Sequence, residues 1–220
     1  TTMSNSSINI TLSERLEGVE EYYFSKKLRE IAELRKAGRP IISLGIGSPD
    51  QPPHPSVVEA LYECAKRPEV HVYQPYKGAE CLREAFGAWY KKYYGVELDT
   101  NTEVLPLIGS KEGLMHLCMT FVRHGEQVLI PNPGYPTYRS AVTLSGGEPL
   151  AYTLSPEKGW LPDFDEMEKW DLSRVKMMIM TYPQMPTGAL PTMEMFHRAV
   201  EFATKHNILL IHDNPYSFVR

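Results

Sequence analysis

Cysteine is scarce in this sequence and follows no recognisable pattern. Cys64, Cys81 and Cys118 are odd in number and widely spaced, with no Cys-x-x-Cys motif and no histidine at metal-ligand spacing to them. This spacing predicts neither a disulfide framework nor a metal site. We expect three buried, reduced thiols in a cytoplasmic protein, because disulfides are rare in that compartment.

Long apolar runs and an excess of basic charge are also missing. The apolar runs at residues 175–180 and 208–211 are far too short to cross a bilayer, so no membrane association is predicted. A net charge of −4 gives no basic surface for nucleic acid. The chain opens on a polar segment without a signal-peptide pattern. With 42% hydrophobic and 23% charged residues, the composition is that of an ordinary soluble globular protein.

Short apolar segments alternate with amphipathic segments along most of the chain. Hydrophobic periodicity predicts helices at residues 12–37, 56–66, 80–94, 110–122, 137–145 and 193–206. Strands are predicted at residues 41–44, 104–108, 127–130, 148–153, 175–180 and 208–211. This order predicts an α/β fold with a mostly parallel sheet between two helical layers.

Unusual residues gather in four loops that follow predicted strands. These loops are residues 109–113, 132–136, 181–188 and 213–216. Because the carboxyl ends of parallel strands meet at one edge of a sheet, we expect the four loops to converge there, where α/β proteins bind ligands.

The last of these loops carries an acid and a phenol. Asp213 ends an apolar strand and Tyr216 follows three residues later. A carboxylate in this place can pair with a protonated ring nitrogen, and a phenol can donate to a phenolate. Pyridoxal phosphate offers both groups. A helix cap and a packed aromatic ring would give the same sequence pattern.

Two other loops have features of a phosphate and ring site. Small residues around Ser110 and Lys111 would expose the free N–H groups of a helix start to an anion. An ordinary turn with Ser110 as N-cap is the alternative. Tyr135 stands next to prolines, which would hold its ring against a planar cofactor or pack it in the core. The segment from Gly45 lacks the third glycine of a dinucleotide-binding motif.

Six motifs in a fixed order support a more specific interpretation. They lie at residues 44–50, 73–83, 109–111, 133–136, 186–188 and 213–216. In this order they resemble the class I and II aminotransferases of pyridoxal-phosphate fold type I, over residues 40–220. The resemblance implies the three-layer α/β/α fold of that family, pyridoxal 5'-phosphate as cofactor, and amino acid and 2-oxo acid substrates.

The resemblance also implies a role for five residues around the cofactor. Ser110 and Lys111 would hold its phosphate, and Tyr135 would stack on its ring. Asp213 would keep the ring nitrogen protonated, which makes the ring an electron sink. Tyr216 would hydrogen-bond the phenolic oxygen.

Two further residues concern the substrate and the partner subunit. Gly47 would approach the substrate carboxylate through its main chain. Tyr73 would reach the phosphate of the neighbouring subunit, which implies a homodimer with shared active sites. By the same resemblance, residues 1–50 form part of the small domain, with the N-terminal helix and a substrate-side segment. Residues 51–220 form the N-terminal part of the large cofactor-binding domain.

The chain departs from the family pattern in two places. Met185 stands where family members usually carry an asparagine that donates to the phenolic oxygen, so this bond is lost unless Gln184 or water replaces it. The family's catalytic lysine lies a few tens of residues after Asp213, whereas this sequence ends at Arg220. The catalytic residue is therefore unknown, and we expect a partial chain, truncated at the C-terminus and inactive alone.

Three functions are compatible with these motifs. The first is transfer of an amino group from an amino acid to a 2-oxo acid. The second is a pyridoxal-phosphate-dependent C–S lyase of the same fold, which would use the same cofactor residues. The third is the aminotransferase-like domain of a transcription regulator. A regulator would need a basic winged-helix segment upstream, and the first forty residues do not have that pattern.

Overall fold

The structure is a computed structural model that describes residues 10–16, 19, 21–45, 47 and 50–219. The chain forms two compact units: Thr1–Tyr22 with Gly109–Arg220, and Tyr23–Ile108. The domain boundary predicted after residue 50 refers to the complete family fold and stays a prediction. Each unit is described below by itself.

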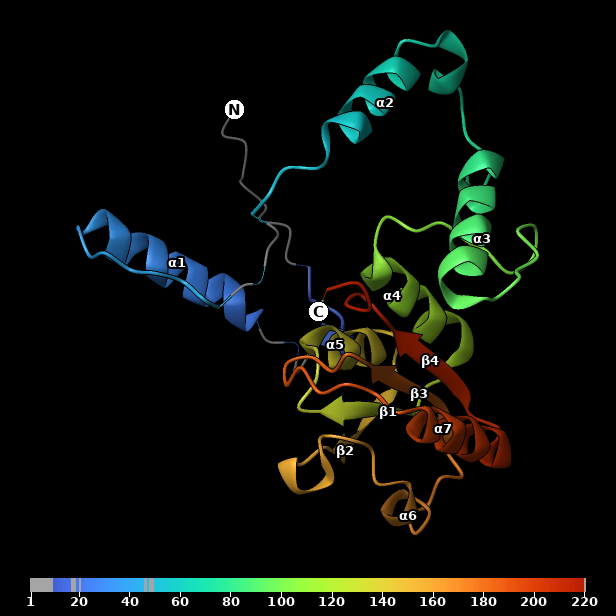
Figure 1. The fold of residues 1–220 in the computed structure, drawn as a ribbon. Coiled ribbons are helices and arrows are strands. Elements are labelled where there is room, and N and C mark those ends of the chain that lie inside the picture. The colour runs from blue at the N-terminus through green and yellow to red at the C-terminus, as the bar shows by residue number, and fades with distance from the viewer. Residues whose placement is uncertain (1–9, 17–18, 20, 46, 48–49, 220) are drawn as a thin grey trace, which may run out of the picture. The chain divides into compact units, whose positions relative to one another are not determined.

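A parallel sheet forms the centre of the first unit (Figure 1). Its strands are β1 (Gln127–Asn132), β2 (Glu148–Thr153), β3 (Val175–Thr181) and β4 (Leu209–Asp213), in the order β2-β1-β3-β4. All three pairings are parallel. The register aligns Thr181 of β3 with Asp213 of β4, so these two strands end side by side. The predicted α/β fold class is confirmed.

Helices cover both faces of this sheet because successive strand residues point to opposite sides. The helices α4 (Ser110–Phe121) and α5 (Pro136–Leu144) pack with one set of strand residues. This set is Val128, Ile130, Met177 and Ile179. The short α6 (Phe164–Met167) and α7 (Met193–His206) pack on the other face with a second set. That set includes Leu129, Met178 and Met180. The predicted three-layer arrangement is therefore present in this unit.

The methionine-rich strand lies in the middle of the core. Met177, Met178 and Met180 are at most 1% exposed, as expected for unbranched apolar side chains that fill a buried strand. Trp160 and Trp170, in the long connection after β2, pack against the core on the α6 and α7 side. They fix a segment that contains only the 3₁₀ turn η3 (Pro156–Lys158) and α6.

The second unit is helical in its described part. It contains α1 (Tyr23–Lys36), α2 (Pro55–Ala65), the 3₁₀ turn η2 (Pro68–His71) and α3 (Glu80–Tyr94). Arg83 of α3 is buried and donates to the carbonyl oxygens of Thr100 and Gly78, each at 2.9 Å. This arginine therefore ties the loop before α3 to the turn after it.

Several predicted elements are wrong. Instead of one helix over residues 12–37, the structure has the 3₁₀ turn η1 (Glu14–Leu16) and then α1. Gly18, a poor helix former, interrupts the sequence between them. The strands predicted at residues 41–44 and 104–108 are absent from the described chain. Pro106 removes a ladder donor from the second segment. The first segment has no paired neighbour in the described chain, and an isolated strand is not stable.

Two details at single residues also differ from expectation. His54, not Ser56, caps α2: its side chain accepts from the Ser56 amide, and Pro55 starts the helix. Of the three cysteines expected to be buried, only Cys118 is, whereas Cys64 and Cys81 are exposed. No helix within the described residues is long and apolar enough to cross a membrane.

Candidate functional site

Asp213 is the last residue of β4 and is only 9% exposed. Its Oδ2 atom accepts a hydrogen bond of 2.8 Å from the hydroxyl of Tyr138 on α5. The preceding residue, His212, uses the other face of the strand, where it contacts the Tyr182 carbonyl at 2.9 Å and the ring of Phe196. The predicted opposite directions of His212 and Asp213 are confirmed. A buried carboxylate therefore lies at the carboxyl edge of the sheet.

The loop after β1 brings an aromatic pair to the same place. Gly134 passes so close to the backbone that a Cβ atom there would lie 2.4 Å from the carbonyl oxygen of Pro131. Only glycine fits this turn without a backbone shift. The next residue, Tyr135, is half-buried, and its ring packs edge-on against that of Tyr138 with 5.7 Å between centroids. The tight turn thus places Tyr135 beside the partner of Asp213.

The N-terminus of α4 adds a set of donors. Gly109 precedes the helix with a φ of +140°, so Ser110 is the first helical residue, as predicted, and not the N-cap of the alternative interpretation. Helix α4 is 12 residues long, and the amides of its first two residues, Ser110 and Lys111, precede the first turn's hydrogen bond from the Glu112 amide to the Gly109 carbonyl. Free amides and the helix dipole make such a terminus suitable for a phosphate.

Lys111 connects this terminus to the aromatic pair. Its Nζ atom lies 5.4 Å from the ring centroid of Tyr135 and 5.5 Å from that of Tyr22. A hydrogen bond to Tyr135 raises the pKa of Lys111, so the ammonium stays charged. Burial alone would raise the pKa of Tyr135, but hydrogen bonds from Lys111 and Thr137 outweigh this effect and lower it. Positive charge and donors therefore surround the Tyr135 hydroxyl.

Gln184 organises the loop after β3. It is buried, and its Nε2 atom donates to the carbonyl oxygens of Pro133, at 2.9 Å, and Met185, at 2.7 Å. Its Oε1 atom accepts from the amide and the hydroxyl of Thr187. Both amide hydrogens are thereby used. Of the two replacements left open for the missing asparagine, Gln184 and water, Gln184 is therefore already engaged, because its side chain holds the two loops together.

Met185 lies against Tyr216. The Tyr216 hydroxyl contacts the Met185 sulfur at 3.5 Å, and a thioether is a weak acceptor that cannot donate. Tyr216 is therefore the donor of this pair, at the same sheet edge as Asp213.

Contacts link most of the predicted site residues. They run from Lys111 to Tyr135, from there to Tyr138, and on to Asp213. Gln184 connects the loops after β1 and β3, and Met185 next to it contacts Tyr216. The predicted convergence of the four loops is observed.

Two predicted residues lie in the other unit. Tyr73 is 90% exposed and stands outside any regular element, and Gly47 is also exposed. Their roles stay predictions. Ile46, Ser48 and Pro49, which flank Gly47 in the predicted substrate loop, lie outside the described residues.

Sequence reasoning missed Tyr138 altogether, and it missed the role of Gln184 in joining two loops. Tyr138 follows Tyr135 by three positions, a spacing that places both rings on one side of a helix start. That spacing was the available signal for Tyr138. Gln184 had no comparable signal, because its bonds depend on the paths of two separate loops.

The residues at this edge fit pyridoxal phosphate in their chemistry. The Asp213 atom Oδ1 accepts no hydrogen bond from the described residues, so it is available to a protonated ring nitrogen. A half-buried aromatic ring, a phenol donor and a helix N-terminus with a nearby ammonium complete the set. The described residues contain no group of three His, Cys, Asp or Glu side chains that could hold a metal ion.

Known proteins are similar to this chain in sequence and in fold. An LL-diaminopimelate aminotransferase from Dehalococcoides mccartyi is 41% identical over 206 residues, which are 94% of this chain and 53% of that protein. Transaminase BacF from Bacillus subtilis is 40% identical over 95% of this chain and 52% of its own length. The structure of apo-BacF superimposes with a TM-score of 0.87, over 94% of this chain and 52% of that one.

The chain thus spans about half the length of the curated relatives it matches. The family model for aminotransferase class I and II matches residues 39–218. That match covers most of the sequence, including every loop of the sheet-edge site. The chain therefore belongs to the class I and II aminotransferase family.

Proposed function

We propose that this chain provides the cofactor-holding part of an aminotransferase that moves an amino group from an amino acid to a 2-oxo acid on pyridoxal phosphate. The observation that carries the proposal is Asp213. It is a buried carboxylate at a strand end, with one oxygen held by Tyr138 and the other without a partner among the described residues. A cationic ring nitrogen would compensate its charge.

Each neighbouring residue has a separate task in this proposal. Ser110 and the first amides of α4 bind the phosphate, and Lys111 adds a positive charge next to it. Tyr135 covers one face of the ring, and Tyr216 donates to the phenolic oxygen. Bound in this way, pyridoxal phosphate supplies an electron sink for bonds at the substrate's α-carbon. Asp213 maintains the sink by keeping the proton on the ring nitrogen.

The names of the relatives favour amino transfer over the two alternatives. The relatives with about 40% identity are named as an LL-diaminopimelate aminotransferase and a transaminase. The cofactor residues alone would serve a lyase equally well. We therefore propose an amino acid as donor, with LL-diaminopimelate as the first to be assayed.

Assembly and compartment belong to the same proposal. In a homodimer, Tyr73 of each subunit would donate to the phosphate in the other subunit's site. The exposed, irregular position of Tyr73 is compatible with this reach. The expected compartment is the cytoplasm, where thiols such as the exposed Cys64 and Cys81 stay reduced.

Cofactor binding to the chain tests the proposal. Pyridoxal phosphate added to the protein should quench its tyrosine and tryptophan fluorescence with a saturable dependence on concentration. Asp213→Ala should weaken binding at least roughly tenfold, because a charge-assisted hydrogen bond is lost. Asp165→Asn is the matched control, since that carboxylate is exposed and lies on the other face of the sheet.

Activity is the second measurement. A polypeptide of the relatives' full length that contains this chain should release a 2-oxo acid from the amino donor, and Asp213→Ala should abolish the release. Equal cofactor binding by wild type, Asp213→Ala and Asp165→Asn would contradict the proposed site. Elimination of a sulfur group without amino transfer would support the lyase instead.

A further inference from the structure

Tyr138 makes the hydrogen bond that fixes the carboxylate of the candidate site. It belongs to α5 and is 1% exposed, so no solvent competes for its hydroxyl. The hydroxyl donates to Asp213 Oδ2 at 2.8 Å. Among the described residues this is the bond that sets the orientation of the carboxylate, because Oδ1 accepts none.

Thr181 lies behind this pair. It is the register partner of Asp213 on the neighbouring strand and is 1% exposed. Its hydroxyl oxygen is buried and makes no well-formed hydrogen bond in the described chain. Three elements, β3, α5 and β4, thus bring a threonine, a tyrosine and an aspartate together.

The pKa of Tyr138 favours the protonated phenol, which is the form that can donate a hydrogen bond to Asp213. Burial raises the pKa of this phenol, and the negative charge of Asp213 raises it further, while the nearby Thr181 hydroxyl acts weakly in the opposite direction. The phenol therefore keeps its proton at neutral pH. A neutral donor restrains the carboxylate without cancelling its charge.

We propose that Tyr138 is a positioning residue that turns Asp213 so that Oδ1 faces the ring nitrogen of the cofactor. The proposal rests on the proposed function. Tyr138 acts through Asp213, because its hydroxyl donates to the Oδ2 atom of Asp213 and not to the cofactor. Without this bond the carboxylate could rotate, and a smaller share of molecules would present Oδ1 correctly.

Tyr138→Phe removes the hydroxyl and little else. We expect roughly tenfold weaker binding of pyridoxal phosphate, measured by fluorescence titration, since a hydrogen bond to a charged group is lost. Tyr152→Phe is the matched control. Tyr152 is 2% exposed and also makes one hydrogen bond of 2.8 Å, to the carbonyl of Ile179, but it packs on the other face of the sheet. Both variants should unfold at similar temperatures, and only Tyr138→Phe should lose affinity.

A double mutant separates positioning from a general loss of structure. If Tyr138 acts through Asp213, then Tyr138→Phe should change affinity much less in an Asp213→Asn background than in the wild type. Thr181→Val removes a buried hydroxyl without a well-formed hydrogen bond and leaves Tyr138 intact, so it should bind the cofactor like the wild type. Equal losses from Tyr138→Phe and Tyr152→Phe, or full additivity with Asp213→Asn, would overturn the positioning role alone. Absence of saturable binding by the wild type would overturn the proposed function and this inference together.

Discussion

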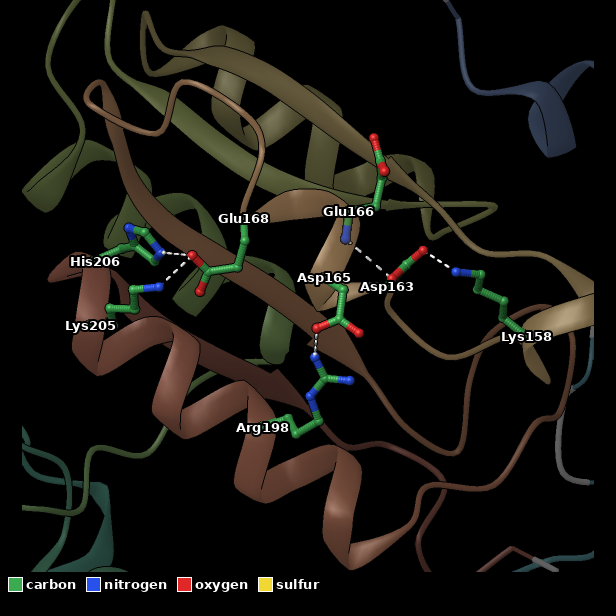
Figure 2. Close-up of polar contacts among 8 residues, drawn as sticks. All are labelled: Lys158, Asp163, Asp165, Glu166, Glu168, Arg198, Lys205 and His206. Carbon is green, nitrogen blue, oxygen red and sulfur yellow. Dashed lines mark hydrogen bonds and ion pairs between the residues drawn. The ribbon is translucent and has the colours of Figure 1, made fainter.

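The two faces of the sheet use polar side chains in opposite ways. On the α5 face, Tyr138 and Asp213 form a buried hydrogen bond. On the α6 and α7 face, ion pairs stand in solvent (Figure 2). There Arg198 of α7 reaches Asp165 at 2.5 Å, and the side chain of Asp165 is 80% exposed. The α5 face therefore has one hydrogen bond that is shielded from solvent. The α6 and α7 face has several ion pairs that are exposed to solvent.

The ion pairs in and beside α6 involve several neighbouring charged side chains. One carboxylate oxygen of Glu168, Oε2, contacts both Lys205, at 2.6 Å, and His206, at 3.0 Å (Figure 2). Asp163 pairs with Lys158 close by. Water and salt can replace any one of these partners, so exposed pairs stabilise a fold weakly. A buried polar group has no such substitute, and losing its partner costs the full desolvation penalty. Burial, more than charge, should therefore decide which of these contacts matter.

The largest effect should come from the buried amide of Gln184. Gln184→Ala removes its bonds to Pro133, Met185 and Thr187 and leaves their polar groups unpaired. We expect a loss of about 2–4 kcal/mol in the free energy of unfolding, measured by urea titration. Gln127→Ala is the matched control, because that amide makes one weak exposed contact at 3.5 Å. It should change stability by less than about 0.5 kcal/mol. Similar losses in both variants would show that burial does not decide which of these polar contacts matter.

The parts of this molecule that sequence could predict are those governed by local periodicity. The strand at Glu148–Thr153 and the helices Glu80–Tyr94 and Met193–His206 match the predicted bounds. The strand predicted at residues 104–108 does not form. A strand needs a neighbouring strand to pair with, and the local sequence pattern contains no information on such a neighbour. In the site, the Asp213 and Tyr216 motif was visible in sequence, whereas the role of Gln184 in joining two loops was not.

A smaller effect should appear at alkaline pH. Burial raises the pKa of the Cys118 thiol from 9.0 to about 11. The unfolded chain loses the thiol proton at a lower pH than the folded protein does. The stability contributed by the buried Cys118 thiol is therefore fully present below pH 9 and is lost as the pH rises through about 11. Cys118→Ala should unfold more readily than wild type at pH 8, and the gap should narrow by on the order of 2 kcal/mol by pH 11.

The exposed thiols provide the control for this pH dependence. Cys64→Ala, which removes an exposed thiol, is the matched variant for the loss of a cysteine. Urea titrations at a series of pH values measure both variants. A constant gap between wild type and Cys118→Ala from pH 8 to pH 11 would contradict the assigned cause.

A change at Met185 should alter cofactor binding and leave the fold intact. Met185→Asn introduces an amide donor next to the Tyr216 hydroxyl, where the sulfur can only accept. We expect pyridoxal phosphate to bind roughly three- to tenfold more tightly, as one additional hydrogen bond would give. Met185→Leu, which has neither a donor nor the sulfur, should bind like wild type. If the asparagine and leucine variants bind equally, Met185 does not face the cofactor's phenolic oxygen.

The smallest effect should come from Glu168 on the exposed face. Hydrogen bonding to Lys205, assisted by His206, lowers the pKa of this carboxyl. Its stabilising effect is therefore present above the ordinary pKa of a glutamate and is lost as the pH falls through the lowered value. Glu168→Gln should shift the midpoint of thermal unfolding by less than about 2 °C at pH 7, because solvent screens both ion pairs. Concentrated salt should reduce even this shift, and the two proteins should converge in acid. Thermal unfolding of Gln184→Ala in the same experiment gives the comparison. If Glu168→Gln shifts the midpoint as much as Gln184→Ala does, and salt does not reduce the shift, then exposed ion pairs stabilise this fold as strongly as its buried polar contacts.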